Sequence, residues 1–373
     1  VYKRQTLNGL VLDALEYNPD LAGAAGRVLE ARALLGGAQS AQWPTVEIGG
    51  TASRSKTSEQ LTGGMANPYG NYYDLHATLR YEIDLWGKLS RGKEAAYATL
   101  VASEQDRRTV AQGLIAEVVR TWLEIRELQL HVPHTERTIA NFENNLVPVR
   151  ERYRRGLVSA LDVHLASQNL AAAQSAEPQF RQLLAGARRR LEILAGRYPA
   201  GNLAASDLDG PDGALYREIM PAPLAEVPTG LPSELLERRP DLAAAEMRLH
   251  SSVARIGEAK AALYPRIALT ASAGAASSDL SDLFTNGTDV WSLAGNLFMP
   301  LINRGATQAQ IKAAEARAAQ SVAAYRQAVL VAFGEVENAL DQDLYQSQQE
   351  IFLADSAEQA RRSVDLAQER DRR

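Results

Sequence analysis

The chain has 373 residues and a formal net charge of −5, with 40 lysines and arginines interleaved among 45 aspartates and glutamates. This charge pattern disfavours nucleic acid as a partner, and the absence of cysteine excludes disulfides, thiolate metal sites and a cysteine nucleophile. No window reaches the roughly 18 uncharged apolar residues of a membrane-spanning helix.

Two separate motifs recur along the chain with the same spacing. Asn18-Pro19-Asp20-Leu21 is echoed by Arg239-Pro240-Asp241-Leu242, and Gln42-Trp43-Pro44 is echoed by Leu263-Tyr264-Pro265. The offset is 221 residues from Pro19 to Pro240 and again from Pro44 to Pro265. This period is too long for a solenoid repeat, so we expect a duplicated subdomain and a pseudo-symmetric molecule.

Each repeat is predicted to begin with an amphipathic helix, over residues 7–41 in the first and 233–262 in the second. Apolar residues recur there at helical spacing, and Ser233 is a typical helix start. Pro44 and Pro265 follow, and proline both removes a helical hydrogen bond and holds the preceding residue extended. These two prolines are the expected helix-to-strand breaks.

A pair of strands is predicted after each break, because apolar and polar residues alternate there. The expected strands are 46–52, 74–85, 267–273 and 291–301. Polar loops rich in Gly, Ser, Asn and Thr join each pair, over 54–72 and 275–288. This alternation fits two structures: a two-layer sheet with one face on a core, or the wall of an outer-membrane β-barrel.

The remaining sequence is predicted to form helices far longer than those of a globular domain. From about 89 to 196 an apolar stripe keeps close to the 3.5-residue spacing of coiled coils, and we expect the chain to turn back near Gly156. Pro133 and Pro148 lie inside this span and are expected to bend it. A second long helix begins at Ala306 and lacks a returning partner. Since the chain also opens without a Met or a signal segment, we expect the natural protein to be longer.

Enzymatic chemistry has little support in the sequence. His131 and His134 lie three residues apart on a predicted helix, but no third ligand is placed beside them, so we interpret them as an exposed pair. The sequence holds no Gly-x-Ser-x-Gly motif, phosphate-binding loop or dinucleotide fingerprint. We therefore expect no catalytic residue, no cofactor and no metal.

Several long motifs stand in a consistent order. The first repeat carries YEIDLWGK at 81–88 and RYRRGLVSALDV at 152–163, and the second carries LLERRPDL at 235–242, ALYP at 262–265 and PLINRG at 300–305. Together these resemble the TolC/OprM-like outer-membrane efflux channels of the outer membrane factor family. The second set resembles the lipoprotein branch that serves resistance-nodulation-division (RND) pumps. That branch carries a lipid-modified cysteine at its mature N-terminus, and this chain has none.

The resemblance implies a mainly α-helical fold with a small β part, in which long coiled-coil hairpins form an α-barrel. Four strands per chain would contribute to a trimeric, 12-stranded transmembrane β-barrel, since the smallest closed barrels need about eight strands. The expected segments are a helix at 1–44, strands 1 and 2 at 45–86, a periplasmic hairpin at 87–197, an equatorial linker at 198–232, a helix at 233–265, strands 3 and 4 at 266–301, and a long periplasmic helix, the truncated second hairpin, at 302–373.

On this reading one face of the strands meets lipid and the other meets a water-filled lumen. The expected lipid-facing residues are Leu75, Leu79, Tyr81, Trp291, Leu293 and Met299. The expected lumen-facing residues are Arg80, Glu82 and Asn296. Trp86 and Trp291 are expected near the membrane interfaces, where an indole meets both apolar and polar surroundings. The alternative is that these aromatic residues belong to the core of a soluble sheet.

The resemblance also implies roles for the turn of the first long hairpin. Gly156, Leu157 and Ser159 match the periplasmic tip that contacts the adaptor protein, and the alternative for them is a plain helix end. Asp162 matches a position whose carboxylate links the closed tip to the neighbouring hairpin. The alternative for Asp162 is a solvated acid on a helix face.

The function implied is the outer-membrane channel of a tripartite efflux system. A homotrimeric tube would carry small molecules from an inner-membrane RND-type pump and a periplasmic adaptor (membrane fusion) protein to the exterior. It would lie in the outer membrane of a Gram-negative-type cell and extend into the periplasm. Two alternatives stay open: a type I protein-secretion exit duct, and a coiled-coil scaffold with no role in transport.

Overall fold

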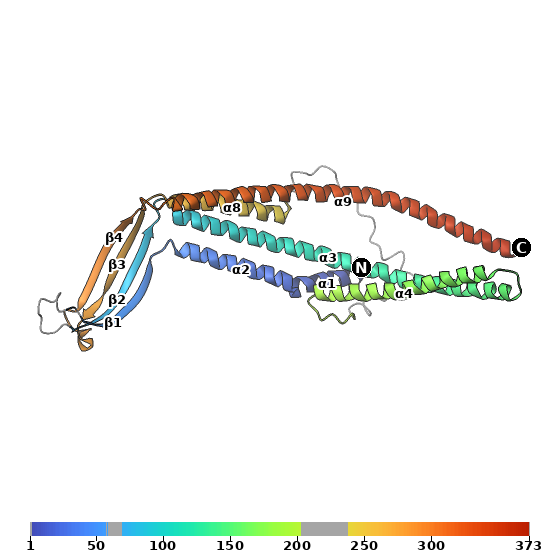
Figure 1. Ribbon diagram of the computed structural model, residues 1–373, viewed down its shortest axis with the longest axis horizontal. Coiled ribbons are helices and arrows are strands. Elements are labelled where there is room, and N and C mark those ends of the chain that lie inside the picture. Colours follow the sequence, from blue (N-terminus) through green and yellow to red (C-terminus); the bar gives the residue numbers. More distant parts are fainter. Residues whose placement is uncertain (1, 57, 59–68, 203–237, 373) are drawn as a thin grey trace. The chain divides into compact units, whose positions relative to one another are not determined.

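A computed structural model describes residues 2–56, 58, 69–202 and 238–372. Its helices are α1 (Tyr2–Tyr17), α2 (Pro19–Ser40), α3 (Lys88–Arg154), α4 (Ala160–Leu194), α8 (Pro240–Ala261) and α9 (Ala306–Arg372) (Figure 1). Its strands are β1 (Thr45–Lys56), β2 (Tyr69–Ile83), β3 (Arg266–Ser277) and β4 (Asp289–Phe298), with a short 3₁₀ helix at Leu280–Asp282. The predicted fold class, mainly helical with long helices and a small antiparallel sheet, is confirmed.

The chain divides into two compact units. Unit 1 comprises Val1–Leu29 and Glu104–Gly230, and unit 2 comprises Glu30–Ser103 and Leu231–Arg373. Most of the expected linker at 198–232 and the expected helix start at Ser233 lie outside the described residues. Among the helices that the structure describes, none is both long and apolar enough to cross a membrane.

The 221-residue offset reappears in the bounds of the elements. α8 begins and ends 221 residues after α2, and β3 begins and ends 221 residues after β1. In both copies a helix of 22 residues is followed by a short turn and a strand of 12 residues. The duplication inferred from the two motifs is therefore a duplication of structure.

The prediction of one helix over 7–41 is wrong, because the structure separates α1 from α2 at Asn18. Pro19 has no N–H with which to continue α1. The Asn18 Oδ1 atom instead accepts hydrogen bonds from the backbone N–H groups of Asp20 and Leu21, at 2.9 and 3.2 Å, so its side chain caps α2. α3, in contrast, is a single helix through both Pro133 and Pro148.

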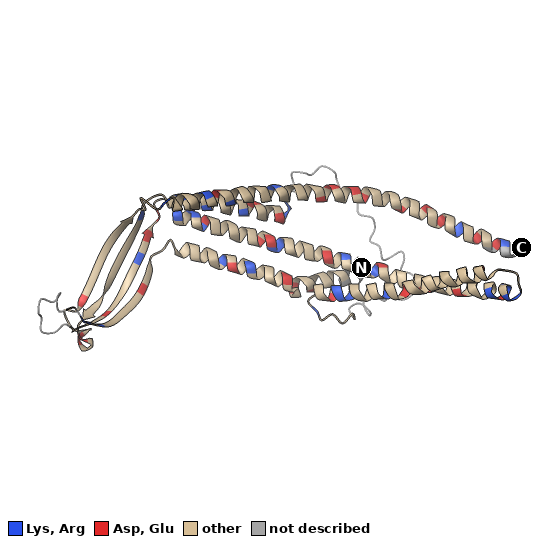
Figure 2. Ribbon diagram, viewed as in Figure 1, with Lys and Arg blue, Asp and Glu red and all other residues tan. Residues whose placement is uncertain are grey.

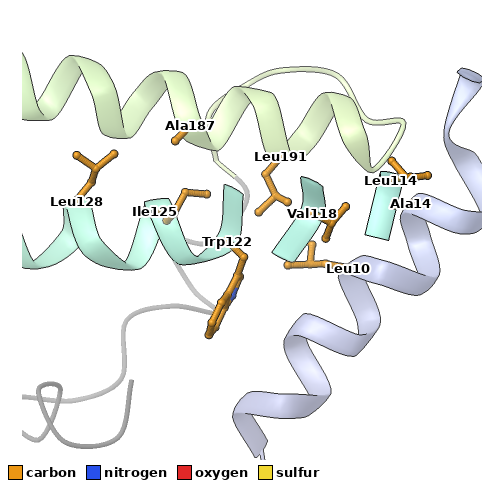
Figure 3. Packing of buried hydrophobic residues seen from close by; sticks show 9 residues of the cluster. All are labelled: Leu10, Ala14, Leu114, Val118, Trp122, Ile125, Leu128, Ala187 and Leu191. Carbon is orange, nitrogen blue, oxygen red and sulfur yellow. The ribbon is translucent and has the colours of Figure 1, made fainter. Parts of the chain in front are cut away.

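The core of unit 1 forms where α1, α3 and α4 pack together (Figure 3). On α3 its residues recur every three or four positions, which places them on one helix face. They are Leu114, Val118, Trp122, Ile125 and Leu128 from α3, with Leu10 and Ala14 from α1 and Ala187 and Leu191 from α4. This is the apolar stripe predicted from the sequence. The Asn18 Nδ2 group also donates to the carbonyl oxygen of Leu194 at 3.0 Å, which ties the α1–α2 junction to the end of α4.

The helices of unit 2 pack through small residues. α3 buries Ala95, Ala98 and Ala102, and α8 buries Ala244, Ala254 and Ala261. A hydroxyl pair, Thr99 and Ser251, joins α3 to α8 at 3.0 Å, and the Ser251 hydroxyl also donates to the Ala95 carbonyl at 2.9 Å. Small side chains let helix backbones approach closely, which is why these helices lie side by side.

The sheet belongs to unit 2 and combines both repeats. Its strand order is β1-β2-β3-β4, and all three pairs are antiparallel. Strands β1 and β2 come from the first repeat, β3 and β4 from the second, and Ile83 opposite Ile267 lies at the seam between them. The two weaker predicted strands are longer than expected. The last one ends earlier than expected, at Phe298, shortly before Pro300, which has no N–H to donate to a ladder.

Candidate functional site

The four strands place apolar side chains together on one face of the sheet. Directly opposed residues of an antiparallel pair point to the same face, and one row across the sheet reads Val46, Leu79, Ala271 and Leu293. The neighbouring odd-numbered positions of β2 and β4 share this face. Trp291 and Leu293 are 78% and 74% exposed, so within one chain the apolar face is uncovered.

Most of the expected lipid-facing residues lie on this apolar face. They are Leu75, Leu79, Tyr81, Trp291 and Leu293. Met299 differs, because it lies one residue beyond the end of β4 and is not part of the ladder. Sequence reasoning missed Val46, Ile48, Leu269 and Leu297, which share the face. The signal for Val46, Ile48 and Leu269 was present as the weaker alternation of β1 and β3, and Leu297 belongs to the clear alternation of β4.

The opposite face of the sheet is polar. It holds all three expected lumen-facing residues: Glu82 and Asn296 both align with Ala268, and Arg80 lies two positions before Glu82 on β2. Arg80 donates to the Glu47 carboxylate at 2.6 Å, and Glu82 accepts from Lys88 at 3.0 Å.

Two further polar contacts on this face were not predicted. The Ser272 and Ser292 hydroxyls pair at 2.8 Å across β3 and β4, and His76 Nδ1 lies 2.8 Å from the Asp74 carboxylate. His76 stands between two glycines on the neighbouring strands, Gly49 and Gly274.

The two outer strands leave the sheet with open edges. β1 and β4 each pair with one strand among the described residues, so one side of each backbone has no sheet partner within this part of the chain. Such edges recruit another strand unless something covers them. The apolar face and the open edges are thus two separate features that a single chain leaves incomplete.

A compact junction joins the sheet to the helices of unit 2. Pro44 and Pro265 stand directly before β1 and β3. Trp86 stacks on Tyr264 with ring centroids 4.8 Å apart, and its indole N–H donates to the Pro265 carbonyl at 2.7 Å. Asp84 accepts hydrogen bonds from the backbone N–H groups at the start of α3, at 3.0 and 2.8 Å. The end of β2 is therefore fixed to the start of α3.

The turn between α3 and α4 is closed by two standard helix caps. Gly156 has a φ of +73°, its N–H donates to Tyr153 O, and the Leu157 N–H donates to Arg152 O, which is a Schellman motif. Ser159 then caps α4 in a capping box with Asp162. Leu157 is 69% exposed, so this apolar side chain projects from an ordered turn.

The Asp162 carboxylate has a local structural role. Its Oδ2 atom accepts from both the Ser159 hydroxyl and the Ser159 backbone N–H, at 2.8 Å each. These hydrogen bonds lower the pKa of Asp162 below its usual value, because they favour the ionised form. The Ser-x-x-Asp spacing is a recognisable capping-box pattern, so the sequence already held this signal.

The two histidines interpreted as an exposed pair differ: His134 is exposed, whereas His131 is half-buried and contributes to packing in unit 1. His131 stacks on Phe180 of α4 with ring centroids 4.9 Å apart and planes at 5°. His131 Nε2 lies 3.6 Å from the Glu127 carboxylate on its own helix. In the part of the chain that the structure describes, no group of three histidine, aspartate or glutamate side chains could hold a metal ion.

Comparison with known proteins identifies the family. The model of the family described as "Outer membrane efflux protein" matches residues 10–197 and 231–373. The solvent efflux pump outer membrane protein SrpC of Pseudomonas putida is 32% identical over 339 residues, which is 91% of this chain and 70% of that protein. The pyoverdine export outer membrane protein OpmQ of Pseudomonas putida is 31% identical, over 98% of this chain and 76% of that protein.

Solved structures agree with the sequence relatives. The outer-membrane channel OprN superimposes with a TM-score of 0.82 and 30% identity, over 95% of this chain and 77% of that one. The open state of the MtrE outer membrane channel of Neisseria gonorrhoeae gives a TM-score of 0.75 and 28% identity, over 90% of this chain and 72% of that one. The resemblance drawn from the motifs is confirmed: this chain belongs to the outer membrane efflux protein family, and it is a non-enzymatic efflux channel of the outer membrane.

Proposed function

We propose that three copies of this chain close a 12-stranded barrel in the outer membrane and continue as a helical tube into the periplasm. The exposed apolar face of the four-stranded sheet carries this proposal. Apolar residues facing outward and polar residues facing inward are the pattern of a membrane barrel wall. Four strands with two open edges need further strands to close, and copies of the same chain supply them.

The tube is proposed to pass small molecules delivered by an RND-type inner-membrane pump through a periplasmic adaptor. Relatives named for solvent efflux and for pyoverdine export support a small-molecule cargo. Gly156, Leu157 and Ser159 are the proposed adaptor contacts, because they form an ordered turn with an exposed leucine. Asp162 is proposed to link the tip to a neighbouring hairpin. Its capping bonds use Oδ2, and within the described residues Oδ1 makes no hydrogen bond, which supports this proposal.

The barrel is tested by placing one charge on either face of β4. Leu293→Arg puts a guanidinium on the apolar face, where lipid contact costs about 2–4 kcal/mol per arginine at the bilayer midplane. Ser292→Arg puts the same group one residue earlier, on the polar face. We expect L293R to abolish detergent-extractable trimers from outer membranes and S292R to retain them. Normal trimers from both variants would overturn the assignment of the two faces.

The tip is tested with Leu157→Glu, which should leave the trimer intact while abolishing efflux-dependent resistance and cross-linking to the adaptor. Leu183→Glu is the matched control, because Leu183 is also exposed on α4, at 47%, but lies far along the helix from the turn. We expect L183E to keep resistance near the wild-type level. Equal resistance in L157E and wild type would show that the tip is not part of the docking surface.

A further inference from the structure

An open groove of about 640 Å³ lies within unit 2, where α2, α3, α8 and α9 meet. Its walls are built from small side chains on all four helices, among them Ala38, Ala95, Ala96, Ala259, Ala262 and Ala314. Because these side chains end at Cβ, the helices can pack and still leave space between them. The volume lies within the roughly 300–1,000 Å³ that is usual for small-molecule sites.

The rim of this groove is strongly basic. Lys88, Lys93, Arg255 and Arg317 line it, and Glu258 is the acid among the lining residues. Figure 2 shows lysines and arginines, with some acidic residues among them, on α3, α8 and α9 in the part of these helices nearest the sheet. This local excess of positive charge contrasts with the formal net charge of −5 for the whole chain.

Three of these four cations form no ion pair with a carboxylate within the described residues. Lys88 is paired with Glu82 at 3.0 Å, a carboxylate that does not line the groove. The side chains of Lys93, Arg255 and Arg317 make no ion pair or hydrogen bond within the described residues. Lys93 is half-buried, so part of its hydration is lost. Like charges gathered at one groove repel each other, and an anion that enters it relieves the repulsion.

We propose that this groove is a binding site for an anion that carries an apolar body, such as an aromatic sulfonate or carboxylate. The acid group lies against Lys93, Arg255 and Arg317, and the apolar body packs on the alanine methyl groups. A divalent cation or a cationic solute would meet charge of its own sign and would be repelled. The site goes beyond the proposed channel function, because helices of one chain supply every lining residue.

The phosphate of a phospholipid offers the same chemistry as a soluble organic anion. The experiment therefore uses both sources as probes on the purified full chain in neutral detergent. One arm titrates 2-naphthalenesulfonate and, as its uncharged match, 2-naphthalenesulfonamide. The other arm asks whether phosphatidylglycerol in mixed micelles displaces the bound sulfonate. Displacement assigns the groove to lipid headgroups as well, and absence of displacement assigns it to soluble anions.

We expect the sulfonate to bind about tenfold more tightly than the sulfonamide, because the half-buried Lys93 and the exposed Arg255 and Arg317 each contribute modestly. The preference should fall as salt is raised, since salt screens such pairs. In the variant K93Q/R255Q/R317Q the two probes should bind equally. E258Q removes the negative charge of the one acid that lines the groove, and should strengthen sulfonate binding severalfold. This variant still tests the proposal if the triple variant does not fold. Equal binding of both probes to the wild type, or a preference that survives in the folded triple variant, overturns the proposal.

Discussion

At the scale of single residues, Gly274 is fixed by close contact between two strands. A Cβ atom at this position would overlap the carbonyl oxygen of Leu75 and the Cα of His76, which are backbone atoms that cannot turn aside. Gly295 on β4 is the natural comparison, because a Cβ there would meet only the Leu269 side chain at an ordinary 3.7 Å. The two glycines thus look alike in the sequence and differ in what surrounds them.

We predict that Gly274→Ala destabilises the sheet by about 1–3 kcal/mol, the usual cost of forcing extra atoms into a packed position. Gly295→Ala should cost much less. The measurement is the temperature at which detergent-solubilised trimers dissociate in a gel-shift assay. A G274A trimer as stable as the wild type would show that β2 and β3 can separate locally without loss.

Asp162 gives a residue-scale prediction about pH. Its pKa in the folded chain lies below the ordinary 3.8, so its ionised form stabilises the cap above pH 3.8, and that contribution is lost as pH falls through the lowered value. We predict that Asp162→Asn raises the hydrogen-exchange rate of the Ser159–Asp162 backbone amides at pH 7. The difference from wild type should shrink once pH falls below the folded pKa of Asp162.

Glu143→Gln provides the control for this experiment, because Glu143 is an exposed acid on α3 whose side chain makes no ion pair or hydrogen bond within the described residues. Its substitution should leave the exchange rates of the turn unchanged at both pH values. Equal rates in D162N and wild type at pH 7 would contradict the assigned capping role.

At the scale of elements, the start of α8 is held to α9 by a charged cluster. Arg239 donates to Asp241 on its own helix at 2.7 Å and lies 2.7 Å from the Glu335 carboxylate on α9. The hydrogen bonds from Arg239 lower the pKa of Asp241, and the same contacts raise the pKa of Arg239. Arg239 is largely covered, at 23% exposed, so solvent screens its contacts less than those of a surface pair.

We predict a coupling energy of about 1 kcal/mol between Arg239 and Glu335 in a double-mutant cycle of R239Q and E335Q. This value is lower than for a fully buried pair, because the Glu335 side chain is 57% exposed and solvent screens the charge. Lys260 and Glu315 join the same two helices but are 54% and 49% exposed, so their coupling should be under about 0.5 kcal/mol. Both coupling energies are measured from the denaturant midpoints of the wild type, the two single variants and the double variant of each pair. Equal couplings would mean that burial does not distinguish the two pairs.

These elements also show what the sequence allowed us to predict. Period-two alternation separated the two sheet faces correctly at Leu79 and Arg80, because a strand exposes alternate residues to different surroundings. The break at Asn18 was missed because the first helix keeps one apolar stripe on both sides of it, so periodicity alone carries no sign of the gap. The hydrogen bond from Trp86 to Pro265 and the presence of Lys93 and Arg255 at one groove join residues far apart in the sequence. They have no local pattern and appeared only in the structure.

At the scale of the whole molecule, trimer closure predicts that β4 of one chain pairs with β1 of the next. The chain has no cysteine, so any disulfide that forms must join cysteines that were introduced. We predict that Cys at Glu47, combined in turn with Cys at Ser292, Ala294 or Asn296, yields covalent trimers for one register under mild oxidation. These positions share the polar face of their strands.

Cys at Leu293 is the control for this scan, because its side chain points to the other face and its Cβ cannot approach that of Glu47. It should give monomers only on a denaturing gel. If no same-face pair forms covalent trimers while trimers are present before oxidation, the barrel is not closed by β1 and β4.

The double cap between α3 and α4 has a consequence for the speed of assembly. The glycine at the helix end and the capping box satisfy the backbone of the turn before any partner arrives. The adaptor that we propose to dock here would therefore bind a turn that is already ordered, and little ordering would remain to slow the encounter. Association at this turn should then be limited by diffusion and orientation, and the lifetime of the assembled complex will depend on the side chains that the turn presents.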